Sequence, residues 1–325
     1  MFTISFRTRR EDRSARAPGS PHLIGVKGLD RAYGRVGAWR TIRRPRRAGP
    51  EVHRRHLGPF TTHVTYRRDD GAVAEWRSRA HRKGASMVSR QDRSGWWAPR
   101  RASWWIAVLF IIGSACFAIG PFPGFVQLVG AAADAAVFFA GSLFFTAAAA
   151  LQYLETVNVD RGPDRVGERR RLRVASFEPR RIDWWASVVQ LAGTLFFNVS
   201  TFEALQEGLS TAQENRLIWA PDVFGCACFL IASALAWGET CGGVFCRPRR
   251  QAEWWVAALN LVGSVAFAIA GVASYFVPDT GDILDLAAAN WTTGIGALCF
   301  LAGAVGLLVE GRRAGTPAAL VRARG

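Results

Sequence analysis

The stretch RASWWIAVLFIIGSACF (residues 101–117) decides the fold, because it is the first copy of a pattern that occurs three times. In each copy a Trp-Trp pair is followed by Gly nine positions after the first Trp, by a hydroxyl residue next, and by Phe at position thirteen. The matched residues are Trp104, Trp105, Gly113, Ser114 and Phe117, then Trp184, Trp185, Gly193, Thr194 and Phe197, and then Trp254, Trp255, Gly263, Ser264 and Phe267. Five matched positions in three copies indicate an internal repeat.

A second element follows each copy of the first. The segments GSLFFTAAAALQYLE, GCACFLIASALAWGE and GALCFLAGAVGLLVE align without gaps, and each has Gly, a small residue and Glu at intervals of seven. These positions are Gly141, Ala148 and Glu155, then Gly225, Ala232 and Glu239, and then Gly296, Gly303 and Glu310. An interval of seven places them on one helical face, and small residues two turns apart favour close helix packing in lipid.

Each repeat is therefore a pair of apolar segments, and no Lys or Arg interrupts any of them. The predicted helices cover residues 102–120, 134–154, 183–203, 218–238, 254–276 and 290–309. Each approaches the roughly 20 residues that a bilayer core requires. We expect an all-α integral membrane protein with six transmembrane helices. They form three parallel-repeat helical hairpins in a pseudo-threefold bundle. Core helices of a large soluble protein are the alternative. Four isolated polar residues are tolerable in lipid if they face a neighbouring helix, namely Gln152, Gln190, Asn198 and Asn260, and interhelical hydrogen bonds are expected at Gln190 and Asn260.

The rest of the chain divides by composition. Residues 1–60 are rich in Arg, Gly and Pro and are predicted to be a disordered basic tail. Residues 61–83 alternate around Asp70-Gly71, which predicts a β-hairpin that must dock on something to be stable. The further predicted units are a juxtamembrane linker (84–101), repeat 1 (102–155), an Arg-rich loop (156–182), repeat 2 (183–239), repeat 3 (253–310) and a carboxyl-terminal tail (311–325).

The distribution of charge predicts the orientation. Residues 1–103 hold 25 of the 41 Lys and Arg residues and 8 of the 25 Asp and Glu residues. The connectors alternate: residues 156–182 contain eight Arg, whereas residues 121–133 contain no basic residue. Because basic loops stay on the cytoplasmic side, both termini are expected in the cytoplasm, in a multi-pass plasma-membrane protein whose first apolar segment is a retained span. The Trp pairs would then lie at the inner interface.

The basic tail suits anionic lipid headgroups at the inner leaflet. Lipid is favoured over nonspecific binding to nucleic acid as the partner, and a solvated tail with no specific partner is favoured over both. The oligomeric state is not predicted.

Glu155, Glu239 and Glu310 end the second helix of each repeat, whereas Arg pairs precede the first. We hypothesise three Arg–Glu clasps that close the bundle at its inner face, for example between Glu155 and Arg180 or Arg181. The alternative is a cation or proton site, since intramembrane carboxylates often mark ion paths. Gln190 and Asn260 share one repeat position and could instead line a polar cavity; the first copy has Phe110 there.

Catalytic, cofactor and metal sites are not predicted. No histidine follows Trp104, which excludes imidazole-based haem or zinc sites in the membrane part. Cys241 and Cys246 are the only cysteine pair in a polar loop; they are expected to be two reduced thiols, with a metal or redox role as the alternative. The candidate structural and interface residues are the three Trp-Trp pairs, the six glycines Gly113, Gly193, Gly263, Gly141, Gly225 and Gly296, and the three glutamates.

The repeat, seen best in WWVAALNLVGSVAFAIAG followed by GALCFLAGAVGLLVE, resembles the YrhK-like family of two-span membrane domains, here in three tandem copies over residues 104–310. The resemblance implies architecture and no activity. We therefore expect a non-enzymatic membrane protein with a scaffold or regulatory role. The alternative is a small-solute or ion transporter or channel with a path through the bundle, and an enzyme is the third reading.

Overall fold

The computed structural model describes residues 51–67, 73–78, 102–158, 173–248 and 250–313. Its long helices coincide with the six predicted apolar segments and differ from them only at the ends. They are α2 (Ala102–Ile119), α4 (Ala131–Asn158), α5 (Ile182–Glu203), α7 (Ala220–Cys241), α8 (Ala252–Ala273) and α9 (Leu286–Arg313). The short helix α3 (Pro123–Val129) lies between α2 and α4.

The largest difference lies before α7. The helix α6 (Thr211–Glu214) and the π-helical turn η2 (Asn215–Trp219) extend it to Thr211. The Ser210 hydroxyl accepts a hydrogen bond from the Gln213 backbone N–H, and the Gln213 side chain in turn accepts one from the Ser210 N–H. This capping box fixes the start of the segment in a stretch that reads as a polar connector.

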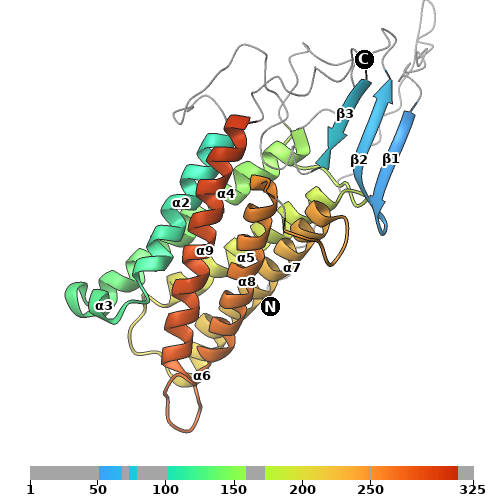
Figure 1. Ribbon diagram of the computed structural model, residues 1–325. Helices are drawn as coiled ribbons and strands as arrows, with labels where there is room; N and C mark the ends of the chain where they lie inside the picture. The colour runs from blue at the N-terminus through green and yellow to red at the C-terminus, as the bar shows by residue number, and fades with distance from the viewer. Residues whose placement is uncertain (1–50, 68–72, 79–101, 159–172, 249, 314–325) are drawn as a thin grey trace, which may run out of the picture. The chain divides into compact units, whose positions relative to one another are not determined.

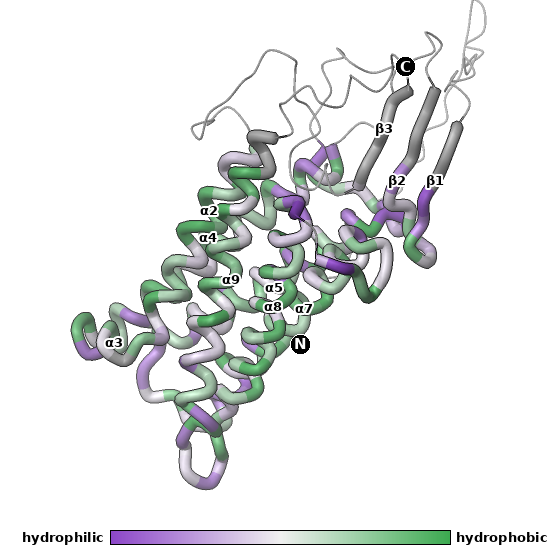
Figure 2. The backbone as a smooth tube through the Cα atoms, in the orientation of Figure 1, coloured by the Kyte–Doolittle hydropathy of each residue, from purple (hydrophilic) through white to green (hydrophobic). Residues whose placement is uncertain are grey.

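Five of the helical segments are long and apolar enough to cross a bilayer, which makes the chain a multi-pass membrane protein. They are 102–119, 131–158, 211–241, 252–273 and 286–309. Helix α5 is not among them, because Asp183, Gln190, Asn198 and Glu203 lower its hydropathy. In Figure 2 hydrophobic residues run along the helices, and hydrophilic residues gather at their ends and in the loops.

The six long helices form a closed ring in the order of the sequence. Helices α2 and α4, α5 and α7, and α8 and α9 pack as hairpins, and contacts of α4 with α5, α7 with α8, and α9 with α2 join the hairpins (Figure 1). The sequence could not give this order. The core lies inside the ring and is built from phenylalanine and alanine side chains.

The amino-terminal part of the described chain is a three-stranded antiparallel sheet. Its strands β1 (Glu51–Leu57), β2 (Phe60–Arg67) and β3 (Val73–Arg77) are ordered β1-β2-β3. Strands β2 and β3 pair with Arg67 opposite Val73, in agreement with the predicted hairpin. Strand β1 lies in the segment predicted to be disordered, so that prediction is wrong for residues 51–57. The rest of the predicted tail, residues 1–50, lies outside the described residues.

The sheet docks on the end of the bundle where the Trp pairs lie. The Thr61 backbone N–H donates to the Arg180 carbonyl oxygen at 3.0 Å. Ser78 Oγ donates to Glu239 Oε1 at the end of α7. A Leu57 methyl group lies 3.0 Å from the place that a Cβ on Gly238 would occupy. These contacts supply the support that an isolated hairpin lacks in water.

Candidate functional site

The predicted glycines bring the two helices of each hairpin into close contact. A Cβ on Gly113 would lie 3.0 Å from the Gly141 carbonyl oxygen, and one on Gly193 would lie 3.2 Å from the Gly225 oxygen. A Cβ on Gly263 would likewise lie 3.0 Å from the Gly296 oxygen. Because these neighbours are backbone atoms, a larger residue at any of the three sites would push the two helices apart.

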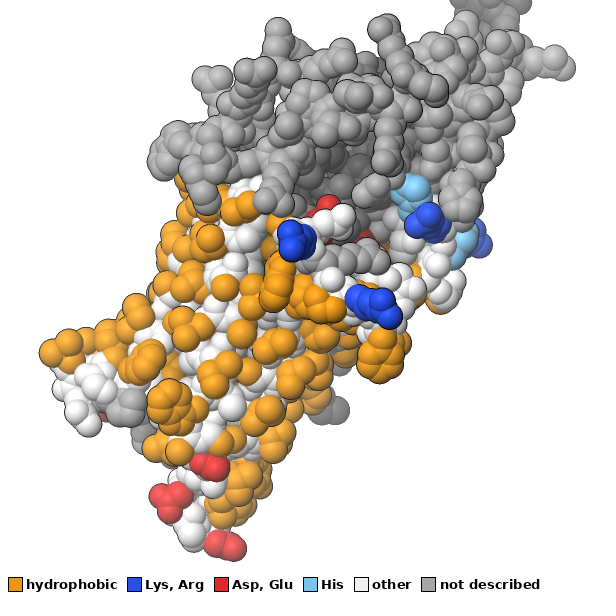
Figure 3. Space-filling model, in the orientation of Figure 1, with side chains coloured by type: hydrophobic (Ala, Val, Ile, Leu, Met, Phe, Trp, Pro, Cys, Tyr) orange, Lys and Arg blue, Asp and Glu red, His pale blue; other side chains and the backbone are white. Residues whose placement is uncertain are grey.

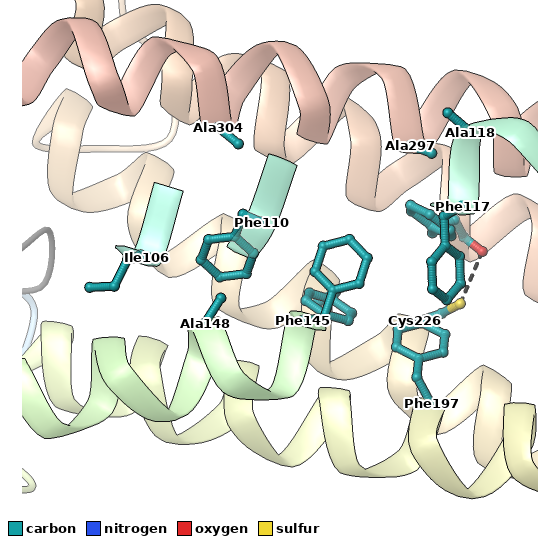
Figure 4. Close-up of a cluster of buried hydrophobic side chains, with 12 residues drawn as sticks. Ile106, Phe110, Phe117, Ala118, Phe145, Ala148, Phe197, Cys226, Ala297 and Ala304 are labelled. Atoms are coloured by element: carbon teal, nitrogen blue, oxygen red, sulfur yellow. Dashed lines mark hydrogen bonds between the residues drawn. The ribbon is translucent and has the colours of Figure 1, made fainter. Parts of the chain in front are cut away.

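A layer of six phenylalanines, one from each long helix, crosses the inside of the ring next to these glycines, and Figure 4 labels three of them, Phe117, Phe145 and Phe197. We call it the phenylalanine layer; its members are Phe117, Phe145, Phe197, Phe229, Phe267 and Phe300.

The first helices of the hairpins contribute one triangle of this layer, with ring centroids of Phe117, Phe197 and Phe267 separated by 6.1–6.3 Å. The second helices contribute the other: Phe145, Phe229 and Phe300 are 5.8–6.4 Å apart. Within a hairpin the two rings are 5.2–5.4 Å apart. The six rings fill the axis of the bundle.

A polar cavity adjoins the phenylalanine layer on its Trp side, where Phe145, Phe229 and Phe300 form part of its wall. All six long helices contribute to its wall, for example through Phe110, Phe145, Gln190, Ser233, Asn260 and Phe300. The space open to water centres inside it is about 40 Å³. Gly303 makes room for one of its amides, since a Cβ there would lie 2.8 Å from Asn260 Oδ1.

One of the isolated polar side chains, Asn198, forms an interhelical hydrogen bond, whereas the two at the cavity do not. Thr146 Oγ1 of α4 donates to Asn198 Oδ1 of α5 at 3.1 Å. Gln190 and Asn260 face the cavity and make no hydrogen bond to any described residue, so the interhelical prediction is wrong for them. Gln152 is buried, and its Oε1 has no hydrogen-bond partner in the described part of the chain.

Hydroxyl pairs that the sequence analysis missed also join neighbouring hairpins. Ser142 and Thr201 connect α4 and α5 at 3.0 Å, and Ser233 and Ser264 connect α7 and α8 at 2.7 Å. Their only sequence signal is a small hydroxyl residue within an apolar helix, which is common.

The three Trp pairs adopt one geometry at the amino-terminal ends of α2, α5 and α8. In each pair the indole rings meet edge to face with centroids 4.9 Å apart. Trp184 is buried and its Nε1 donates to the Ser176 carbonyl oxygen at 2.7 Å. Trp105 and Trp255 are about half exposed. An outward indole at a helix end suits the headgroup region of a membrane.

The hypothesised Arg–Glu clasp is wrong for the first repeat. The Arg181 guanidinium is buried and pairs with Asp183 and, at 2.9 Å, with Glu178. Glu155 makes no ion pair with any described residue. Glu239 accepts the hydrogen bond from Ser78, and the side chain of Glu310 lies outside the described part.

Cys241 and Cys246 form a disulfide, so the expectation of two reduced thiols is wrong. Trp254 Nε1 lies 3.2 Å from Cys246 Sγ, and the Trp237 ring packs on Trp254. The other four cysteines are free thiols. Among the described residues no group of three His, Cys, Asp or Glu side chains is placed to hold a metal ion.

Compared with known protein families, curated protein sequences and solved structures, the chain matches none of them.

Proposed function

We propose that this protein is a non-enzymatic membrane scaffold of six transmembrane helices. The observation that carries the proposal is the phenylalanine layer, which fills the axis of the ring with apolar side chains. A transport path needs polar groups or water along its whole length, and here the polar cavity ends at the layer. A sealed, densely packed bundle supports a structural or regulatory role.

Helix α5 is the sixth span in this proposal. It lies in the ring between α4 and α7, and two of its inward polar side chains, Asn198 and Thr201, bond to α4, while a third, Gln190, faces the cavity. Its outward face exposes apolar side chains, namely Leu195, Phe196, Val199 and Phe202. A helix with bonded polar groups inside and apolar groups outside is compatible with lipid, although its average hydropathy is low.

Three tandem hairpins related by a pseudo-threefold axis are supported by the phenylalanine layer. Each repeat contributes one ring to each triangle, and the distances within and between triangles are nearly equal in all three copies. The glycine contacts and the Trp pairs recur in the same way. On this basis the resemblance to the YrhK-like two-span domains remains our proposal for the origin of the hairpin.

We propose that the protein lies in the plasma membrane with the Trp end of the bundle on the cytoplasmic side. Figure 3 shows acidic side chains at the end where α8 and α9 are joined and basic side chains near the opposite end. The connector between α8 and α9 carries Asp279, Asp282 and Asp285, whereas Arg247 and Arg250 lie in the connector between α7 and α8. This asymmetry follows the positive-inside rule, and it presents the basic segments to anionic lipid headgroups.

Flux measurement in proteoliposomes tests the scaffold against the transporter alternative, which the polar cavity favours. We expect the native protein to pass potassium ions, protons and small neutral solutes no faster than protein-free liposomes. Replacing Phe117, Phe197 and Phe267 with Ala should open a leak. Phe196→Ala on the outward face is the control and should leave the liposomes tight. Saturable flux through the native protein would refute the scaffold role.

A further inference from the structure

The polar cavity is not explained by a scaffold role, because a scaffold core is most stable when it is dry and fully packed. Gln190 on α5 and Asn260 on α8 each carry an amide with one acceptor oxygen and two N–H groups. Neither amide bonds to a described residue, and Ser233 is already paired with Ser264. An amide without a partner in a membrane core costs free energy, since no bulk water reaches it.

We infer that the cavity binds a cluster of about three water molecules that bridges Gln190 and Asn260. The number of water molecules follows from the volume of the cavity. About 40 Å³ is open to water centres, and each water needs about 10–15 Å³. The side chains of the wall favour water over an ion as the ligand. The wall combines two amides and a hydroxyl with phenylalanine rings and contains no charged side chain. An ion would lose its hydration there without compensation, whereas water both donates and accepts hydrogen bonds.

The cluster joins two helices that are not neighbours in the ring, although Phe197 of α5 and Phe267 of α8 meet in the phenylalanine layer. In the ring α7 lies between α5 and α8, so Gln190 and Asn260 face each other across the interior. Water molecules that bridge them tie the second repeat to the third near the inner interface. In the first repeat Phe110 fills the matching position, which limits the site to two amides.

Hydroxyl-radical footprinting of the full chain in lipid nanodiscs tests this inference, because bound water is the source of radicals that oxidise adjacent side chains. Phe110 lines the cavity and Phe117 does not, yet both lie on α2 and are almost equally buried, at 8% and 5% exposure. We expect Phe110 to be oxidised several-fold faster than Phe117. Equally slow oxidation would show a dry cavity, closed for instance by a direct amide–amide hydrogen bond, and would overturn the inference.

Equally fast oxidation of the two rings would show an open water path instead, which contradicts both the enclosed cluster and the sealed axis. A dry cavity, in contrast, leaves the scaffold proposal standing. A double variant, Gln190→Leu with Asn260→Leu, should lower Phe110 oxidation to the level of Phe117. The matched control Asn198→Leu removes an amide that bonds to Thr146 and should leave the Phe110 rate unchanged. Undiminished Phe110 oxidation in a folded double variant would also overturn the inference, and if that variant fails to fold, the native comparison decides alone.

Discussion

Replacing Gly296 with Ala should destabilise the third hairpin by an amount that follows from its surroundings. The added Cβ would lie 2.8 Å from the Phe267 ring and 3.0 Å from the Gly263 carbonyl oxygen. The ring cannot move aside, because it stacks on Phe300 at 5.4 Å and contacts Phe117 and Phe197. Helices α8 and α9 must therefore separate. Overpacking of this kind costs about 1–3 kcal/mol in well-packed cores.

The control is Gly294→Ala, two residues earlier on the same helix. A Cβ at Gly294 meets no atom within 4 Å. Both changes gain the same helix propensity, about 1 kcal/mol in a helix interior, so this term cancels when the two variants are compared. Unfolding in mixed detergent micelles, followed by Trp fluorescence, should place Gly296→Ala about 1–3 kcal/mol below Gly294→Ala. Equal free energies of unfolding would refute the close glycine contact between α8 and α9.

Two further predictions concern the α4–α5 contact and the disulfide. Thr146→Val removes the hydrogen bond to Asn198 and should lower the free energy of unfolding by about 1 kcal/mol, a typical value for such bonds in membranes. Thr292→Val, whose hydroxyl bonds only to the Ala288 carbonyl of its own helix, should have little effect, and equal losses would exclude an interhelical contribution. Alkylation of the purified, unfolded protein should modify four cysteines before reduction and six after it, as read by mass spectrometry; six before reduction would contradict the disulfide between Cys241 and Cys246.

Hydropathy and repeat spacing predicted the helices because a bilayer span needs a long run of apolar residues, and that run is visible in the sequence. The same spacing located the close contacts within each hairpin. Gly113 and Gly141 face each other because glycine allows the backbones to approach. The order of the helices was not predictable, since it depends on the contacts between hairpins. Those contacts are made by alanines and phenylalanines that are common in every apolar helix.

The hydrogen-bond and ion-pair partners of the polar residues could not be predicted from the sequence. Asn198 and Asn260 occupy comparable apolar surroundings in the sequence, yet among the described residues only Asn198 forms a hydrogen bond to a hydroxyl group, that of Thr146. Arg181 was assigned to the distant Glu155, but Asp183 lies two residues away and Glu178 three. A local carboxylate pairs with less loss of chain entropy than one on another helix. Strand β1 was not predicted, because its segment has the basic composition that is typical of disordered tails.

The disulfide and the charge distribution give opposite orientations when each is judged by its usual rule. Disulfides persist in oxidising compartments, which would place the loop after α7 outside the cytoplasm. The basic residues of that same end, eight Arg in 156–182 alone, favour the cytoplasmic side by the positive-inside rule. The charge rule carries more weight here, because it rests on every connector, whereas Cys241 and Cys246 are only five residues apart and form one local bond. A bond of this kind opens and closes with the redox poise of the compartment that it faces. On the orientation that we propose from the arginines, the glutathione pool would determine whether the two sulfur atoms are joined.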